Sequence, residues 1–491
     1  MIDRRAPVRF ELPAPAPDTL ALIDAADRVS RGRGRAHDVR AGVAEGIVCL
    51  DSAMIQAGLG RWTLLGLCPV AEVRGDVGRC ALAALEDGAP ARQIALFGDP
   101  FEALAAMLEP FNALDAGPLG GLPFRGGAVG VFGYGCRAAV ESLSPDQPRW
   151  GEPDAWWGLY DTFLACDRLT GRAWACSWGL PAWGSPPDPA LACARARALV
   201  DALVDAPAPG PCAPVEGLGF EPIMGRAAYE SAAAEVLAAI GQGRCYQGCL
   251  THPLRAARPP EVSALDVFAA LRERSPAPFA ALLACGAPVA LAGASPERFL
   301  SIRAGLMEVR PMKGTRPRGA DAVEDARLRE ALAASEKDRA ENVMIVDLMR
   351  NDLGRVCAIG SVEVPELFTI ESYAAVHQMT STIRGRARPG VGAVEALRAC
   401  FPPGSMTGAP KIEAMRLLAR LETGPRGWYS GVLGHVGFDG DADLSVVIRS
   451  ALVAEGEIVW HVGGGIVADS TIEGEWRESL DKGPRALQGS G

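Results

Sequence analysis

Two segments of the chain place carboxylates at helical spacing. The segment SEKDRAEN carries Asp338 and Glu341 three residues apart, and the segment EGEWRESLDK carries Glu475 and Glu478 at the same interval. Residues three apart share one face of a helix. Two such faces could hold Mg²⁺, which binds one or two protein carboxylates and leaves room for an anionic substrate. Taken alone, the first segment is also typical of a helix capped by Ser335, and the second of a solvated charged face.

A glutamate and a lysine accompany a predicted hairpin. Glu297 lies in SPERF, in the turn before a strand, and Lys313 lies in RPMKGT, at the end of the return strand. A lysine at a strand end is most often solvated, but a buried one beside arginines would have a depressed pKa and could act as a nucleophile or base. A desolvated Glu297 would have a raised pKa and could protonate a leaving oxygen.

Glycine-rich segments could seat an anion. GSMTGAPK precedes a predicted helix, so backbone N–H groups near Thr407 could bind an anion, although the spacing is not that of a Walker A loop. Gly463–Gly465 end a predicted strand, where they permit close approach to a ligand or form a simple bulge. Arg449 could clamp a carboxylate and Tyr429 could add a hydroxyl; a surface arginine and a packed tyrosine are the ordinary alternatives.

The apolar pattern predicts the elements that hold these residues. Helical spacing predicts helices at about 190–204, 227–240, 335–351 and 472–483, and one after Pro410 that buries Ile412, Met415, Leu418 and Leu421. Residues 288–311 read as strands with a hairpin tip at Gly305, and three strands follow the helix after Pro410. Strands in runs with helices segregated between them predict an α+β fold.

A Pro/Gly-rich stretch at 205–222 should not be helical. It divides the sequence into an N-terminal region at 1–204, a connection at 205–224 and a catalytic region at 225–487.

Composition excludes several classes of protein. The 491 residues carry a net charge of −10, which argues against a nucleic-acid surface. The 13 cysteines form no CxxC pair or zinc spacing, which is typical of a reduced compartment. No run approaches the roughly 20 apolar residues of a membrane span, and the N-terminus has no signal-peptide pattern. The sequence therefore predicts a cytoplasmic protein.

Long motifs in a fixed order resemble one enzyme family. SPERF, PMKGTRPRG, SEKDRAENVMIVDLMRNDLGRVC, GSMTGAPK, GGGIVADS and EGEWRES follow one another within about 225–485. They resemble the chorismate-utilising enzymes, which include anthranilate synthase component I, aminodeoxychorismate synthase component I and the isochorismate and salicylate synthases. The segment GGAVGVFGY resembles the N-terminal half of the aminodeoxychorismate enzymes. The resemblance implies two packed β-sheet layers flanked by helices.

The resemblance also implies a set of roles. Mg²⁺, held by Glu341 and Glu478 with Asp338 and Glu475 in support, would bind the ring carboxylate of chorismate, and Glu297 would protonate the departing C4 hydroxyl. The other implied substrate contacts are Gly314, Thr315, His377, Thr407, Tyr429, Arg449, Gly463, Gly464, Gly465 and Lys482.

Lys313 discriminates among members of the family. Anthranilate synthases typically carry a small residue there, whereas in the aminodeoxychorismate enzymes this lysine is thought to attack C2 before ammonia enters at C4. The resemblance therefore predicts amination of chorismate at C4, on the path to para-aminobenzoate and folate. An isochorismate or salicylate synthase that uses water, an anthranilate synthase component I and a non-catalytic chorismate- or tryptophan-binding regulator remain alternatives.

The chain carries no glutaminase signature, so we expect ammonia to come from a separate glutamine amidotransferase subunit. Pro278-Phe279-Ala280 stands where the family has the Pro-Tyr-Met of its tryptophan pocket, and with Ser52 it marks a candidate tryptophan pocket. Cys249 stands where the family usually has asparagine, and Pro403 replaces a glycine.

Overall fold

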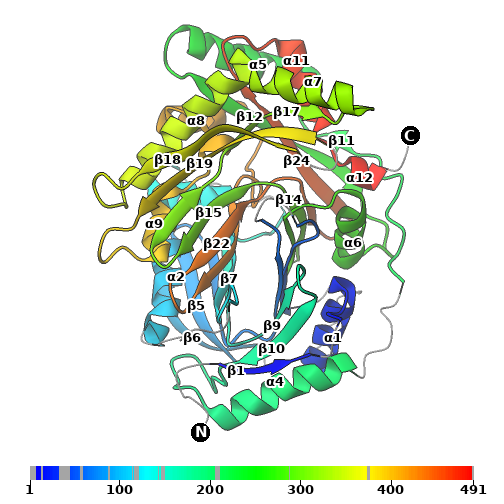
Figure 1. Cartoon of the computed structure of the whole chain (residues 1–491), viewed down its shortest axis with the longest axis vertical. Helices are drawn as coiled ribbons and strands as arrows, with labels where there is room; N and C mark the ends of the chain where they lie inside the picture. Colours follow the sequence, from blue (N-terminus) through cyan, green and yellow to red (C-terminus); the bar gives the residue numbers. More distant parts are fainter. Residues whose placement is uncertain are drawn as a thin grey trace.

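Two large antiparallel sheets form the body of the molecule (Figure 1). The computed structural model describes residues 7–12, 15–32, 45–55, 59–86, 89–112, 114, 121–141, 143–144, 150–204, 211–286, 288–372 and 376–488. The first sheet follows the order β1 (Val8–Glu11), β10 (Arg172–Ser177), β9 (Thr162–Asp167), β3 (Trp62–Gly66), β2 (Glu45–Asp51), β13 (Phe279–Cys285), β14 (Ala290–Ser295), β23 (Ser450–Val453), β24 (Glu457–Ile466), β12 (Gln247–Ala257) and β11 (Glu221–Pro222), and β20 (Gly408–Ala409) pairs with β12.

The second sheet has the same number of strands, twelve. Its order is β17 (Met312–Pro317), β19 (Val376–Arg386), β16 (Leu306–Val309), β15 (Arg298–Arg303), β22 (Ala442–Val446), β21 (Val432–Gly437), β7 (Gly127–Phe132), β8 (Ala155–Tyr160), β4 (Ala71–Asp76), β5 (Arg79–Glu86) and β6 (Ala89–Phe97), and β18 (Glu363–Ser372) pairs with β19.

Strands from both ends of the sequence share each sheet. In the first sheet β2 pairs with β13, with Cys49 opposite Leu282, and in the second β7 pairs with β21, with Gly130 opposite Gly434. Residues 211–220 contain no helix, as the Pro/Gly content predicts. The division at 205–224 therefore separates parts of the sequence whose strands are hydrogen-bonded to each other.

Helices cover the outer faces of both sheets. The helices are α1 (Thr19–Gly32), α2 (Pro100–Leu108), α3 (Arg137–Val140), α4 (Pro189–Val204), α5 (Arg226–Gly241), α6 (Ala264–Arg274), α7 (Ala322–Ala333), α8 (Glu336–Gly354), α9 (Ala393–Cys400), α10 (Lys411–Leu421), α11 (Ile472–Asp481) and α12 (Arg485–Gln488). Figure 1 shows α1 and α4 at the end that carries the N-terminus, and α5, α7, α8 and α11 at the opposite end. None of these helices is long and apolar enough to cross a membrane.

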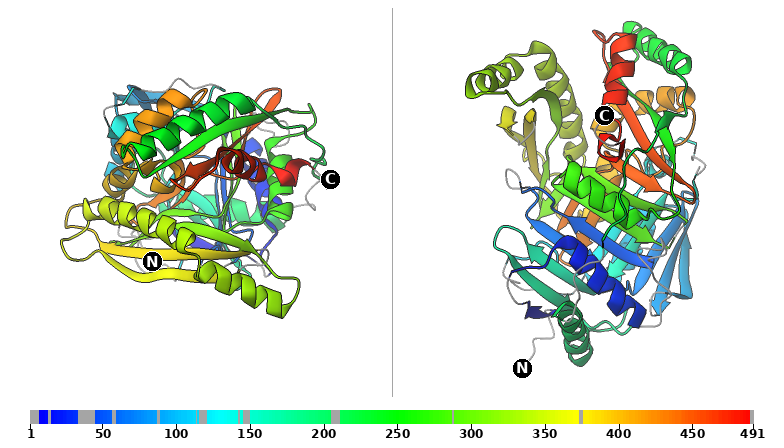
Figure 2. Two further views of the ribbon diagram at one scale, coloured as in Figure 1. Left: turned by 90° about the horizontal axis from the view of Figure 1, so that it is seen from above. Right: turned by 90° about the vertical axis from the view of Figure 1, so that its right-hand side faces the viewer.

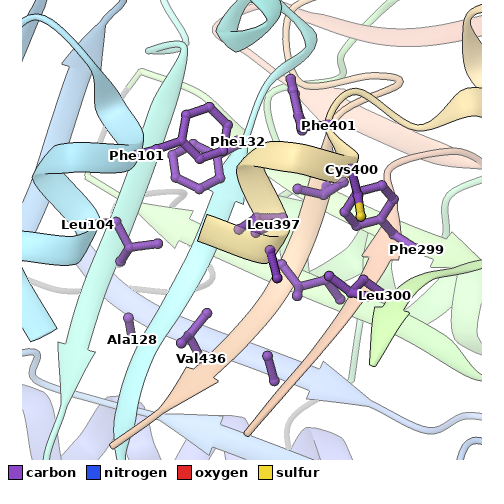
Figure 3. Packing of buried hydrophobic residues seen from close by; sticks show 14 of the residues in the cluster. Phe101, Leu104, Ala128, Phe132, Phe299, Leu300, Leu397, Cys400, Phe401 and Val436 are labelled. Atoms are coloured by element: carbon purple, nitrogen blue, oxygen red, sulfur yellow. The ribbon is translucent and has the colours of Figure 1, made fainter. Parts of the chain in front are cut away.

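The core lies in layers. One cluster of buried side chains joins the facing sides of the two sheets, with Val48 of β2 and Val131 of β7 among its members. Another joins the second sheet to α2 and α9; Figure 3 shows Phe101 of α2 beside Phe132 of β7, with ring centroids 4.3 Å apart. Burial of each such side chain stabilises the fold by about 1.5–3 kcal/mol.

The expected elements are confirmed with small shifts at their ends. The helix opened by Ser335 is α8, whose N-cap hydroxyl accepts from the Asp338 N–H, and it runs to Gly354. The hairpin tip at Gly305 joins β15 to β16.

Two local expectations are wrong. Ile412 is exposed, because only the Met415 and Leu418 side of α10 packs against the core. Four strands, not three, follow α10, and Arg449 lies in the left-handed turn between β22 and β23 rather than in a strand. This turn divides the expected strand into two: β22 belongs to the second sheet, and β23 belongs to the first.

Candidate active site

A cavity of about 620 Å³ lies where the two sheets meet α8 and α11. One wall consists of β17 and α8, and the opposite wall of β24 and α11. Figure 2 shows α8 and α11 on the two separate arms at the end away from the N-terminus. The volume is in the range of small-molecule sites.

The wall formed by β24 and α11 brings Gly464, Glu475, Glu478 and Lys482 together. A side chain at Gly464 would lie 2.7 Å from Glu475 Oε2, so glycine is required for the carboxylate to approach the strand. Ser470 donates to Glu475 Oε1, and Oε2 is buried without a partner. Burial raises the pKa of Glu475, against the hydrogen bond from Ser470.

Lys482 links α11 to the glycine strand. Its Nζ donates to Glu478 Oε1 at 2.8 Å and to the carbonyl of Gly463 at 3.0 Å. Burial acts to raise the pKa of Glu478, but Lys482, Lys313 and Lys337 together hold it below its usual value.

The opposite wall presents Asp338 and Glu341 from the first turns of α8. Asp338 accepts from Arg316 at 2.8 Å and packs directly over Gly314, whose φ of +80° and missing side chain both suit glycine. Burial raises the pKa of Glu341, Lys313 and Lys337 lower it, and the neighbouring charges of Asp338 and Glu478 raise it further. Carboxylates of both walls therefore repel each other across the cavity.

This arrangement fits a divalent cation. No group of three or more His, Cys, Asp or Glu side chains within the described ranges forms a complete metal cage. Mg²⁺ needs only one or two carboxylates when waters and a substrate complete its shell. Glu341 and Glu478 could supply those, and the unpartnered Glu475 oxygen lies on the same side as Glu478, both within 4.0 Å of the position a side chain at Gly464 would take.

Glu297 and Lys313 share the cavity. Glu297 is 5% exposed, between β14 and β15, and its Oε1 has no hydrogen-bond partner. Burial raises the pKa of Glu297, and the Ser405 hydroxyl and the Lys313 charge oppose the rise. Lys313 is half-buried on β17 and makes no ion pair with a described carboxylate, so its amine is free to meet a ligand.

Arg449 and Tyr429 also line the cavity. Arg449 is exposed there, at a φ of +52°, and pairs with no described carboxylate. A non-glycine residue at positive φ is uncommon and is frequent at functional sites. Burial raises the pKa of Tyr429, whose ring stacks on His461 with centroids 5.0 Å apart.

Most of the residues expected at the site line this one cavity. They are Glu297, Lys313, Gly314, Thr315, Asp338, Glu341, Tyr429, Arg449, Gly463, Gly464, Gly465, Glu475, Glu478 and Lys482. The three glycines lie at the end of β24, as expected, and pair there with β12.

Two expected residues lie outside the lining. His377 on β19 is fully buried and bridges Ser372 and Asp325. Thr407 is fully buried, and its hydroxyl donates to the carbonyls of Pro403 and Gly404, so it shapes the loop before α10. The N-cap of α10 is Pro410.

Sequence reasoning missed Gln247, Ser405 and Lys337. Ser405 and Lys337 line the cavity. The Gln247 amide is 1% exposed, has no partner, and lies within 2.7 Å of the position a side chain at Gly465 would take, beside Lys313. Gln247 is the first residue of β12, and the sequence gives no signal that it lies near Lys313, because the two residues meet only through the fold.

A second cavity, of about 550 Å³, lies between the sheets and includes Ser52, Pro278, Phe279 and Ala280. The sequence placed these four residues in one candidate pocket, and the structure brings them together.

The fold and site define the class of this protein. The family described as chorismate binding enzyme matches residues 76–488. The chain therefore belongs to the chorismate binding enzyme family.

Two similar proteins within this family are named aminodeoxychorismate synthase. Aminodeoxychorismate synthase of Streptomyces pristinaespiralis is 42% identical over 454 residues, which are 89% of this chain and 61% of the relative. Aminodeoxychorismate synthase component 1 of Salmonella typhimurium is 39% identical over 394 residues, 79% of this chain and 82% of the relative. This chain thus spans less than two thirds of the Streptomyces protein.

A solved structure confirms the α+β fold. Anthranilate synthase component I from Streptococcus pneumoniae superposes with a TM-score of 0.76 at 28% identity, covering 87% of this chain and 92% of that one.

Proposed function

We propose that this chain aminates chorismate at C4 with ammonia, forming 4-amino-4-deoxychorismate on the path to para-aminobenzoate and folate. The observation that carries the proposal is the placement of the Lys313 amine and the buried Glu297 carboxyl in one cavity with the carboxylates of α8 and α11. The two relatives named aminodeoxychorismate synthase support it.

The cavity offers cations and backbone groups for a dicarboxylate. Arg449 is the group for a bidentate carboxylate contact, Tyr429 adds a hydroxyl, and Lys482 adds charge beside the glycine strand. Gly314 and Thr315 close the side formed by β17. Thr407 and His377 do not line the cavity and would act indirectly. Thr407 holds the loop before α10 through its hydrogen bond to Gly404, and His377 holds Asp325.

Glu341 and Glu478, with Asp338 and Glu475 in support, would hold Mg²⁺. The ion supplies positive charge for the ring carboxylate and draws electron density from the diene when bound. The carboxylates of both walls, two of them with raised pKa values, are the reason for this assignment.

The chemistry proceeds in two displacements. The neutral Lys313 amine attacks C2, the ring double bonds shift toward C4, and the C4 hydroxyl leaves as water with a proton from Glu297. Ammonia then attacks C4, the double bonds shift back, and the C2–N bond breaks to return Lys313 as a neutral amine. The new ammonium group restores the proton of Glu297.

Ammonia comes, in this proposal, from a glutamine amidotransferase subunit. The name of the Salmonella relative, component 1, supports a second component. Free ammonium should replace that subunit in vitro.

Product analysis tests the function. Purified chain with chorismate, Mg²⁺ and ammonium should form a product with the mass of aminodeoxychorismate, and a lyase added afterwards should convert it to para-aminobenzoate. Mass spectrometry and chromatography identify both. Anthranilate as the direct product, or equal turnover to a hydroxylated product without ammonium, would contradict amination at C4. Chorismate left unchanged would favour the regulator.

A further inference from the structure

One arginine behind the wall of the active-site cavity uses every donor it has. Arg426, between α10 and β21, is 2% exposed. Its Nε donates to Glu422 Oε2 at 2.9 Å, and its Nη2 donates to Glu422 Oε1 at 2.6 Å and to the carbonyl of Cys249 at 2.8 Å. Its Nη1 donates to the carbonyl of Met406 at 2.7 Å and to Ser430 Oγ at 3.2 Å. These are all five N–H groups of a guanidinium.

The acceptors come from parts of the chain that are far apart in sequence. Cys249 lies on β12, Met406 in the loop before β20, and Ser430 beside Tyr429. Cys249, Met406 and Tyr429 line the active-site cavity. Arg426 therefore joins three segments of its wall from the outside.

Glu422, the ion-pair partner of Arg426, makes a second set of hydrogen bonds to β12. Glu422 Oε1 accepts from the N–H of Thr251 at 3.0 Å and from its hydroxyl at 2.9 Å. The ring of Tyr134 lies 4.3 Å below the guanidinium. The carbonyl of Thr407 accepts from the N–H of Cys249 at 2.8 Å, so β12 and the loop also contact each other directly.

Stability alone explains this arrangement poorly. A buried ion pair recovers its cost of desolvation only with good geometry, and apolar residues of similar volume often serve a fold as well. Lysine could not replace Arg426, because an ammonium has three donors and no planar fork. The two hydrogen bonds from Arg426 to main-chain carbonyls instead fix the orientation of the peptide groups of Cys249 and Met406.

We propose that Arg426 is a positioning residue, which holds the wall segments of Cys249, Met406 and Tyr429 in the arrangement that turns over substrate. It acts through Ser405, the neighbour of Met406, which faces Glu297 in the cavity. The inference rests on the proposed function, because its main readout is turnover of chorismate.

Arg426→Lys tests the inference, with Arg195→Lys as the matched control. Arg195 donates to the buried Asp161 and to the carbonyl of Leu180 in a partly buried pair outside the cavity. At saturating ammonium and Mg²⁺, Arg426→Lys should lower kcat per folded molecule by about tenfold or more, because small displacements at reacting groups are costly. The KM for chorismate should stay within about threefold, since Arg449 and the carboxylates remain. Arg195→Lys should change neither constant.

A second variant keeps the test decisive if Arg426→Lys folds poorly. Ser430→Ala removes one acceptor of Arg426 and leaves the charge pair intact, and it should lower kcat in the same direction by a smaller factor. A wild-type kcat per folded molecule in both variants, with only the melting temperature lowered, would overturn the positioning role. Product analysis separates the two proposals: wild type that binds chorismate and converts it without aminating it refutes the function, and its kcat still reports on Arg426. Wild type that neither binds nor converts chorismate refutes both.

Discussion

Glu297 and Lys313 share one cavity but differ in surroundings. Glu297 is buried, and burial raises its pKa, so the carboxyl stays protonated to higher pH than a solvated glutamate. Lys313 is half-buried and has no ion-pair partner among the described residues. A proton donor and a free amine at one ligand are the minimum that the proposed first displacement requires.

Glu297→Gln should separate activity from stability. It should lower kcat by about 100- to 10,000-fold, as expected for loss of a general acid. Wild-type kcat should fall as pH rises through the raised pKa of Glu297, and this limb should vanish in the variant. Below the ordinary glutamate pKa of 4.5 the protonated Glu297 carboxyl stabilises the fold, and this contribution is lost as pH rises through the raised pKa of Glu297. The melting temperature of Glu297→Gln should therefore exceed that of wild type at neutral pH only.

Glu152→Gln is the control for Glu297. Glu152 also has a pKa raised by burial but lies outside the cavity, so this variant should change stability without changing kcat. Equal losses of kcat in both variants would contradict the role of Glu297.

Lys313→Ala should reduce amination by on the order of 100-fold or more. Lys313→Arg keeps the charge without the nucleophile and should be as poor. Quenched single turnovers should carry the mass of chorismate less one water on Lys313, one of only four lysines in the chain (Lys313, Lys337, Lys411 and Lys482). Full amination by Lys313→Arg would show that only the charge matters; anthranilate from Lys313→Ala would instead show that the amine directs the nucleophile to C4.

At the scale of elements, packing along each helix brings its carboxylates to the cavity. In α8, Glu341 lies one turn before the buried Ile345 and on the same side of the helix, so the packing of Ile345 and Met349 holds the first turns of α8 against the cavity. In α11, Trp476 stacks on His252 of β12 at 5.3 Å, so Glu475 and Glu478 are held toward the glycine strand.

Gly464→Ala should test that fit. The new methyl group would meet Glu475 Oε2 at 2.7 Å and displace it. We expect the Mg²⁺ concentration for half-maximal activity to rise about 10- to 100-fold, the usual effect of disturbing groups that support metal ligands. Gly219→Ala, which meets open space, is the control. An unchanged Mg²⁺ dependence would argue against the site on α11.

At the scale of the whole molecule, the two sheets join the sequence regions before and after the Pro/Gly-rich connection. A fragment of residues 225–488 would lose β2 beside β13 and β7 beside β21, and would expose long apolar edges. We expect it to aggregate alone and to become soluble on co-expression with residues 1–204, as measured by size-exclusion chromatography. A monomeric, cooperatively folded fragment would instead establish the region at 225–487 as an independent domain.

The cavity between the sheets is the proposed tryptophan pocket. Leu50, Trp62 and Leu433 give it apolar walls, and Arg298 and Asp443 form an ion pair at its edge. We expect L-tryptophan, but not L-alanine, to raise the melting temperature, because a ligand that binds only the folded chain stabilises it. Ala280→Phe should fill the space and abolish the shift. No shift in wild type would contradict tryptophan as the ligand.

Local pattern alone was enough for α4, α5, α8, α10 and α11, for the hairpin and for the carboxylate pairs, because spacing of three or four residues decides which side chains share a helix face. The order of the long motifs was enough for the family. These features depend on residues that are close together in the sequence, so they can be predicted from the sequence alone.

Only the tertiary structure decided what meets across the cavity. Gln247 and Lys313 come together through strands of two different sheets, and Arg426 contacts Cys249 at a separation of 177 residues. Thr407 and His377 were expected at the site, yet both lie outside the lining of the cavity: the Thr407 hydroxyl is bonded within its own loop, and the His377 ring is bonded to Ser372 of β18 and Asp325 of α7. Spacing along a chain carries no distance between sheets, so burial, the raised pKa of Glu297 and the wall behind the cavity follow only from how the two layers pack.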